Sequence, residues 1–169
     1  RLHRSGTVFC RLTLRQSPRP QFPALSVSFS SKVEYGLVAL MELAGSFATG
    51  EVLQVAEIAS RQSIPDRYLE QMLAMLRRGG LLSSVRGPRG GYRLTRSPAE
   101  ITVAEVVHCL EGEAAGRPVS PQRTLELEVL HALAVDLQRQ RRELLAGTTL
   151  HALLERRDAL SQSQVMYFI

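Results

Sequence analysis

The chain has 169 residues, 44% of them hydrophobic and 22% charged, which is enough to bury one core and is ordinary for a globular protein. No Trp, four Tyr and five Phe argue against an aromatic cage, two Cys exclude a disulfide framework, and no apolar run reaches the roughly 20 residues of a membrane span, so we expect a soluble, cytoplasmic protein. The net charge of +5 comes entirely from residues 1–30, which hold five Arg and no acidic residue, so charge is informative only where it concentrates locally.

Residues 1–30 combine Arg and Ser with three Pro and show no hydrophobic period. This composition predicts a disordered segment. Two interpretations stay open: a leader similar to an organelle transit peptide, or translated sequence upstream of a misassigned start, and we favour the second.

Three helices are predicted over residues 31–80. Ser31 and Glu34 have the spacing of a capping box, which places the start of the first helix at Ser31 and its end near Gly45. A short second helix around residues 55–59 is followed by a break at Ser63. Pro65 suits the first position of a third helix, whose apolar stripe is Leu69, Met72, Leu73 and Leu76 and which ends at Gly79 and Gly80. Helix, tight turn and helix together predict a helix-turn-helix.

Two short strands follow, over residues 81–86 and 92–94, joined by a glycine-rich loop over residues 87–91. Glycines can adopt the positive φ that a hairpin tip requires, so this segment predicts the wing of a winged helix. Thr102 and Glu105 form a second potential capping box, and the helix that it starts is expected to end at Gly112.

A polar linker over residues 113–124 leads to a long amphipathic helix from about residue 125 to 145. Its leucines fall at the seam positions of a coiled coil, which predicts a dimerisation helix: Leu130, Leu133, Leu137 and Leu144. A short last helix begins at Leu150, and residues 161–169 are left as a tail. We therefore predict a mainly α fold with a small β-hairpin wing, with a DNA-binding domain over residues 31–112 and dimerisation and C-terminal helices over residues 125–160.

Positive charge concentrates on the helix-turn-helix and wing. Residues 61–96 hold eight Arg against two acidic residues, whereas the segments 31–60 and 97–169 each carry a net charge of −3. Any single exposed Arg is usually ordinary solvated surface. A cationic block inside an otherwise acidic domain instead indicates a phosphate-backbone partner, because ordinary surfaces intersperse their charges.

The third helix supplies candidates for reading bases, since the second helix of a helix-turn-helix enters the major groove. Gln71 is suited to adenine, Glu70 to the amino group of cytosine, and Arg67 to guanine or a phosphate. Tyr68 and Arg61 are expected at the DNA backbone. On the wing, three arginines are candidates for a narrow minor groove: Arg86, Arg89 and Arg93.

Residues 31 to about 155 resemble the iron-sulfur cluster regulator and nitric-oxide-sensitive repressor family of bacterial winged-helix proteins, the IscR and NsrR group, also called the Rrf-two family. The resemblance rests on Tyr68-Leu69-Glu70-Gln71, Gly80-Leu81, Ser84-Val85-Arg86-Gly87-Pro88 and Gly90-Gly91-Tyr92. It implies a transcriptional regulator that binds a palindromic operator in double-stranded DNA as a homodimer through its long helix. It also implies that Glu70 and Gln71 contact bases and that Arg86 enters the minor groove.

The sequence departs from that family in one respect. Cluster-binding members carry three Cys between the fourth helix and the dimerisation helix, whereas residues 111–124 here contain none. A cluster needs several converging thiolates or imidazoles. We therefore expect no cofactor and no metal site, and a regulator that responds to a small-molecule effector, to a regulatory protein or to neither.

Three alternative functions differ from this prediction. An atypical metal or cluster site across the dimer would draw on His108, Cys109, His131 and His151, but their spacing is not that of ligands. A protein-interaction module that has lost DNA binding would have no reason to keep the cationic block. An enzyme is not expected, because the sequence has no phosphate loop, no paired-cysteine metal motif and no nucleophile beside a base.

Overall fold

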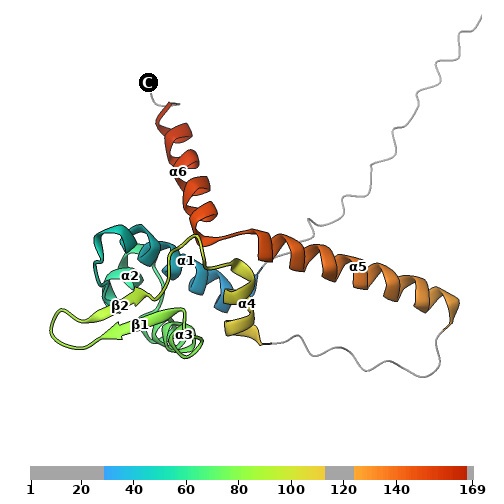
Figure 1. Ribbon diagram of the computed structural model, residues 1–169, viewed down its shortest axis with the longest axis horizontal. Coiled ribbons are helices and arrows are strands. Elements are labelled where there is room, and N and C mark those ends of the chain that lie inside the picture. Colours follow the sequence, from blue (N-terminus) through green and yellow to red (C-terminus); the bar gives the residue numbers. More distant parts are fainter. Residues whose placement is uncertain (1–28, 113–123, 167–169) are drawn as a thin grey trace, which may run out of the picture.

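A computed structural model describes residues 29–112 and 124–166, with side chains described as far as residue 163 (Figure 1). Residues 1–28 of the predicted leader and 113–123 of the predicted linker lie outside this range. The elements are, in chain order, α1 (Ser31–Gly45), the short 3-10 helix η1 (Phe47–Thr49), α2 (Val55–Gln62), α3 (Asp66–Arg78), β1 (Leu82–Val85), β2 (Gly91–Leu94), α4 (Val103–Glu111), α5 (Leu125–Gly147) and α6 (Leu150–Met166).

Helix α1 is the centre of the fold. Its apolar residues recur every three or four positions, so one side of the helix is buried against α3, α4 and α6. Leu40 and Leu43 of α1 meet the stripe of α3 in one continuous apolar core. All four stripe residues predicted for α3 are buried, with exposed fractions of 2% or less. The core therefore fixes which face of α3 remains in solvent.

The turn between α2 and α3 is tight. Ser63 ends α2 with a left-handed φ of 53°, and the backbone N–H of Ile64 donates to the carbonyl of Ala59 at 3.0 Å. Pro65 occupies the capping position, so the first residue of α3 is Asp66, one residue later than predicted. The difference is small, because Pro65 still accepts hydrogen bonds from the first turn of the helix through its carbonyl.

One predicted cap is wrong and the other is confirmed. Ser31 already lies inside α1, and Ser30 takes the capping position without a side-chain bond to the helix. The hydroxyl of Ser30 donates instead to Glu111 at the end of α4, at 2.6 Å. At α4 the predicted box is present: the N–H of Glu105 donates to Thr102 Oγ1 at 3.3 Å, and the N–H of Thr102 donates to Glu105 Oε2 at 2.8 Å.

Strands β1 and β2 form the predicted antiparallel hairpin, with Leu82 opposite Leu94 and Ser84 opposite Tyr92. The hairpin is also tied to the chain before α2, where Leu53 and Tyr92 exchange two backbone hydrogen bonds of 3.1 and 2.9 Å. A Cβ on Gly91 would lie 2.2 Å from the carbonyl oxygen of Leu53. Glycine is therefore required at the base of the wing.

Helices α5 and α6 leave the domain in different directions (Figure 1). Their junction is anchored, because the N–H of Val103 donates to the carbonyl of Thr148 at 2.8 Å and Leu150 is fully buried. Helix α6 continues to Met166, so the short last helix that was predicted to end near residue 160 is corrected to a helix of 17 residues. Residues 167–169 of the predicted tail lie outside the described residues. Within the described ranges, no helix is long and apolar enough to cross a membrane.

Candidate nucleic-acid interface

The outer face of α3 carries the residues predicted to read bases. Arg67, Glu70 and Gln71 are all exposed, because the four buried residues of the stripe occupy the opposite side of the helix. All three lie in the first half of α3. This is the half that a helix-turn-helix inserts most deeply into the major groove.

Tyr68 belongs partly to the core. Its ring packs edge to face against Tyr35 of α1, with ring centroids 5.6 Å apart, and its side chain is half-buried. The remaining exposure suits the DNA-backbone contact predicted for its hydroxyl. Tyr68 therefore packs α3 against α1 and also presents part of its side chain at the surface.

The arginines of the cationic block fall into two groups. Arg61 is ion-paired with Glu42 and Glu57, and Arg96 is ion-paired with Glu105. Within the described part of the chain, no carboxylate pairs with the arginines of α3 or of the wing loop. The charge of that second group is therefore available to an external anion, whereas the charge predicted for DNA at Arg61 is largely compensated inside the domain.

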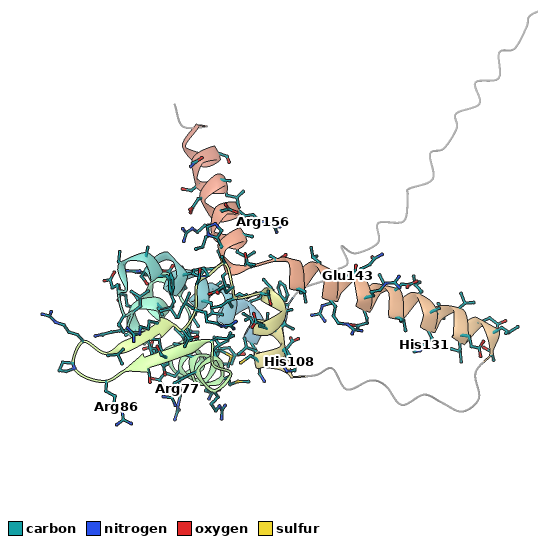
Figure 2. All side chains as sticks on the ribbon, in the orientation of Figure 1. Arg77, Arg86, His108, His131, Glu143 and Arg156 are labelled. Atoms are coloured by element: carbon teal, nitrogen blue, oxygen red, sulfur yellow. The ribbon has the colours of Figure 1, made fainter. Side chains whose placement is uncertain are left out.

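The register of the wing separates its arginines. Arg86 directly follows β1, and its side chain points to the same side of the domain as Arg77 of α3 (Figure 2). Arg93 lies opposite Ser83, and its Nε donates to Ser83 Oγ at 3.3 Å. Arg89 is exposed in the loop between the strands. The structure thus brings Arg86 to the side of α3 and places Arg93 on the side of η1.

One cationic residue of this surface was not among the predicted contacts. Arg77, in the last turn of α3, donates from Nη1 to Ser84 Oγ on β1 at 3.3 Å. Figure 2 shows Arg77 and Arg86 pointing to the same side of the domain. A signal was present in the sequence, because Arg77 follows Glu70 by seven residues and so falls on the same helix face.

The predicted seam of α5 is exposed along its whole length. Leu130, Leu133, Leu137 and Leu144 have exposed fractions of 60, 56, 59 and 66%, and α5 contains no buried residue. An exposed row of large apolar side chains on one face of a helix is typical of a surface that contacts another protein.

Cys109 of α4 is half-buried, and its thiol donates to the carbonyl of Met75 at 3.3 Å. Burial raises the pKa of this thiol, against the lowering effects of the Gly79 backbone and the charge of Arg78. The described residues contain no group of three His, Cys, Asp or Glu side chains arranged to hold a metal ion.

Residues 29–156 match the Rrf2 family, whose description is iron-dependent transcriptional regulator. The chain belongs to the Rrf2 family. It is 41% identical over 132 residues to the HTH-type regulator ORF2 of Azotobacter vinelandii, covering 76% of this chain and 80% of that protein. Rrf2 regulators are DNA-binding winged-helix proteins and not enzymes. The predicted class of protein, a DNA-binding winged-helix regulator, is therefore confirmed, and so is the prediction that the chain is not an enzyme.

Solved Rrf2 structures have the same fold. CymR, the global cysteine regulator of B. subtilis, matches with a TM-score of 0.68 and 30% identity, over 77% of this chain and 98% of that one. IscR of T. potens matches with a TM-score of 0.67 and 33% identity, over 79% and 90% of the two chains.

The segment between α4 and α5 of this Rrf2 chain offers no ligand for an iron–sulfur cluster. The sequence between α4 and α5, residues 111–124, contains neither Cys nor His. Cys109, at the end of α4, donates its thiol to the carbonyl of Met75 and lies against Gly79, the residue that follows α3. A cluster requires several thiolate or imidazole ligands that converge on one point, and this part of the sequence offers none.

Proposed function

We propose that this Rrf2 chain is a dimeric, sequence-specific regulator that binds a palindromic operator in the cytoplasm and works without an iron–sulfur cluster. The observation that carries the proposal is the uncompensated positive face formed by α3 and the wing. On it, Glu70 and Gln71 read bases in the major groove while Arg86 and Arg89 approach the adjacent minor groove.

Dimerisation is supported by α5. Its exposed leucines, with exposed fractions of 56% or more, need an apolar partner, and a second copy of the same helix offers a matching surface. A homodimer would also present two copies of α3, as a palindromic operator requires.

The cluster-free mode of action is supported by the absence of Cys and His between α4 and α5. The protein would then bind its operator in aerobic, metal-free solution. Operator binding that depends on added iron and sulfide would contradict this part of the proposal without affecting the DNA-binding assignment.

The test uses the full chain and a pool of random-sequence duplexes. Selection should enrich one palindromic sequence that binds more tightly than a scrambled duplex, and affinity should fall steeply with salt. Arg86→Ala should weaken binding to the selected duplex by at least tenfold. Arg96→Ala is the matched control, because Arg96 belongs to the same cationic block but is paired with Glu105. Failure to enrich any sequence, or equal losses in the two variants, would overturn the proposal.

A further inference from the structure

Arg77 links the recognition helix to the wing. It lies in the last turn of α3, its side chain is exposed, and its Nη1 donates to Ser84 Oγ of β1 at 3.3 Å. A guanidinium has five N–H donors. The hydrogen bond to Ser84 therefore holds the group in place and leaves most of its donors free.

The same residue extends the face of α3 that reads DNA. Arg77 follows Glu70 by seven residues, almost two full turns, so the two side chains lie on one side of the helix about 10 Å apart along its axis. Ala74 lies between them and is small, so a duplex can approach this stretch closely. Glu70, Ala74 and Arg77 thus form one continuous stripe.

The wing continues this surface. Ser84 lies in β1, and Arg86 follows the last residue of that strand, at the start of the wing loop. Arg77 and Arg86 point to the same side of the domain (Figure 2). Arg77 also belongs to the arginines that have no carboxylate partner among the described residues.

When α3 lies in a major groove and the wing in the adjacent minor groove, one phosphodiester strand must run between them. Arg77 belongs to α3 and donates to Ser84 of β1, so its guanidinium lies between the recognition helix and the wing. We propose that Arg77 binds a phosphate of the strand that separates the two grooves and so fixes the angle at which α3 and the wing engage DNA. The inference rests on the proposed DNA binding and adds to it a contact that carries no sequence information.

The experiment measures the affinity of the full chain for the selected duplex and for a scrambled duplex across a salt series. Arg77→Ala should weaken binding to both duplexes by roughly tenfold, the value of one charge-assisted hydrogen bond. The slope of log affinity against log salt should fall by about one phosphate equivalent. Arg77→Lys should keep that slope, because it keeps the charge.

Arg78→Ala is the matched control, since Arg78 is the next residue of the same helix turn and is also exposed. Its side chain instead lines a surface pocket next to Cys109. The substitution should change neither affinity nor slope. An unchanged slope in Arg77→Ala, or an equal loss in Arg78→Ala, would overturn the inference. Because a phosphate contact forms on any duplex, the scrambled DNA decides this point by itself. Lack of preference for the selected duplex would instead remove the proposed sequence specificity.

Discussion

Tyr35 of α1 and Tyr68 of α3 pack edge to face, with their ring planes at 87° and their centroids 5.6 Å apart. This contact packs the first half of α3 against α1, beside the exposed face of α3. Edge-to-face pairs add about 0.5–1.5 kcal/mol to the burial of the rings themselves.

Tyr68→Ala should therefore lower the free energy of unfolding by about 2 kcal/mol, as judged by urea denaturation. Tyr68→Phe keeps the ring pair and should retain that stability, while losing the DNA-backbone contact predicted for the hydroxyl. Arg67→Ala, at the exposed neighbouring position, is the stability control. Equal stability of Tyr68→Ala and the wild type would show that the aromatic pair does not hold α3.

Gly91→Ala should disrupt the base of the wing. The new Cβ would meet the carbonyl oxygen of Leu53 at 2.2 Å, so the two backbone bonds between Leu53 and Tyr92 cannot both persist. We expect a loss of about 2 kcal/mol in unfolding free energy and weaker DNA binding. The control is Gly147→Ala, where nothing lies within 4 Å and a gain of about 0.5 kcal/mol is expected. A stable Gly91→Ala protein with full affinity would contradict the requirement for glycine.

The capping box at α4 predicts a pH dependence. The N–H of Thr102, and next the side chain of Arg96, hold the pKa of Glu105 below its usual value. A lowered pKa adds stability that is complete above the unfolded pKa of about 4.3 and is lost as the pH falls through the lower, folded value. The unfolding free energy of Glu105→Gln should thus fall below that of the wild type by the largest amount near neutral pH. This difference should disappear in acid. Chemical denaturation at several pH values measures it, and a gap that stays constant into acid would refute the assignment.

Leu137→Arg should convert the proposed dimer to a monomer. A charge at the centre of the apolar seam of α5 should weaken association by roughly a hundredfold, through lost burial and an unpaired cation. Sedimentation of the full chain measures the mass. Arg139→Ala, on the far side of the helix from Leu137, should leave it unchanged. A wild type that sediments as a monomer would refute the role of the seam.

The protein purified without oxygen should contain far less than one iron per chain, and Cys109→Ser should not alter that content. Burial raises the pKa of the Cys109 thiol, so native protein should also react with iodoacetamide more slowly than unfolded protein. Stoichiometric iron with visible absorption would refute the cluster-free proposal.

The sequence could predict those elements whose signals are local. The α3 stripe follows from its period, the wing from its glycines, and the α4 cap from Thr102 and Glu105. The cap of α1 was misplaced by one residue because Ser30 and Ser31 are chemically equivalent candidates, and only the packing of α1 against α4 decides between them. The residues beyond Glu155 show no apolar period, so no sequence pattern indicates the length of α6.

The candidate site was predicted less completely than the fold. The exposed face of α3 could be derived from its buried stripe, so Arg67, Glu70 and Gln71 were accessible to sequence reasoning. The hydrogen bond between Arg77 and Ser84 was not, because it depends on the angle between a helix and a hairpin. The ion pair of Arg61 with Glu42 depends likewise on the packing of α2 against α1, which no local pattern encodes.

The anchored junction at Thr148 has a consequence for the spacing of binding sites on DNA. Its carbonyl is held by Val103, and its hydroxyl donates to Leu144 within α5 at 2.8 Å, so α5 cannot swivel freely about the domain that carries α3. The proposed dimer would therefore hold its two α3 helices at a set distance, which matches half-sites about one helical repeat, or a whole number of repeats, apart. Inserting half a repeat between the half-sites would turn one of them to the far side of the duplex. Only one of the two DNA-binding domains could then bind at a time.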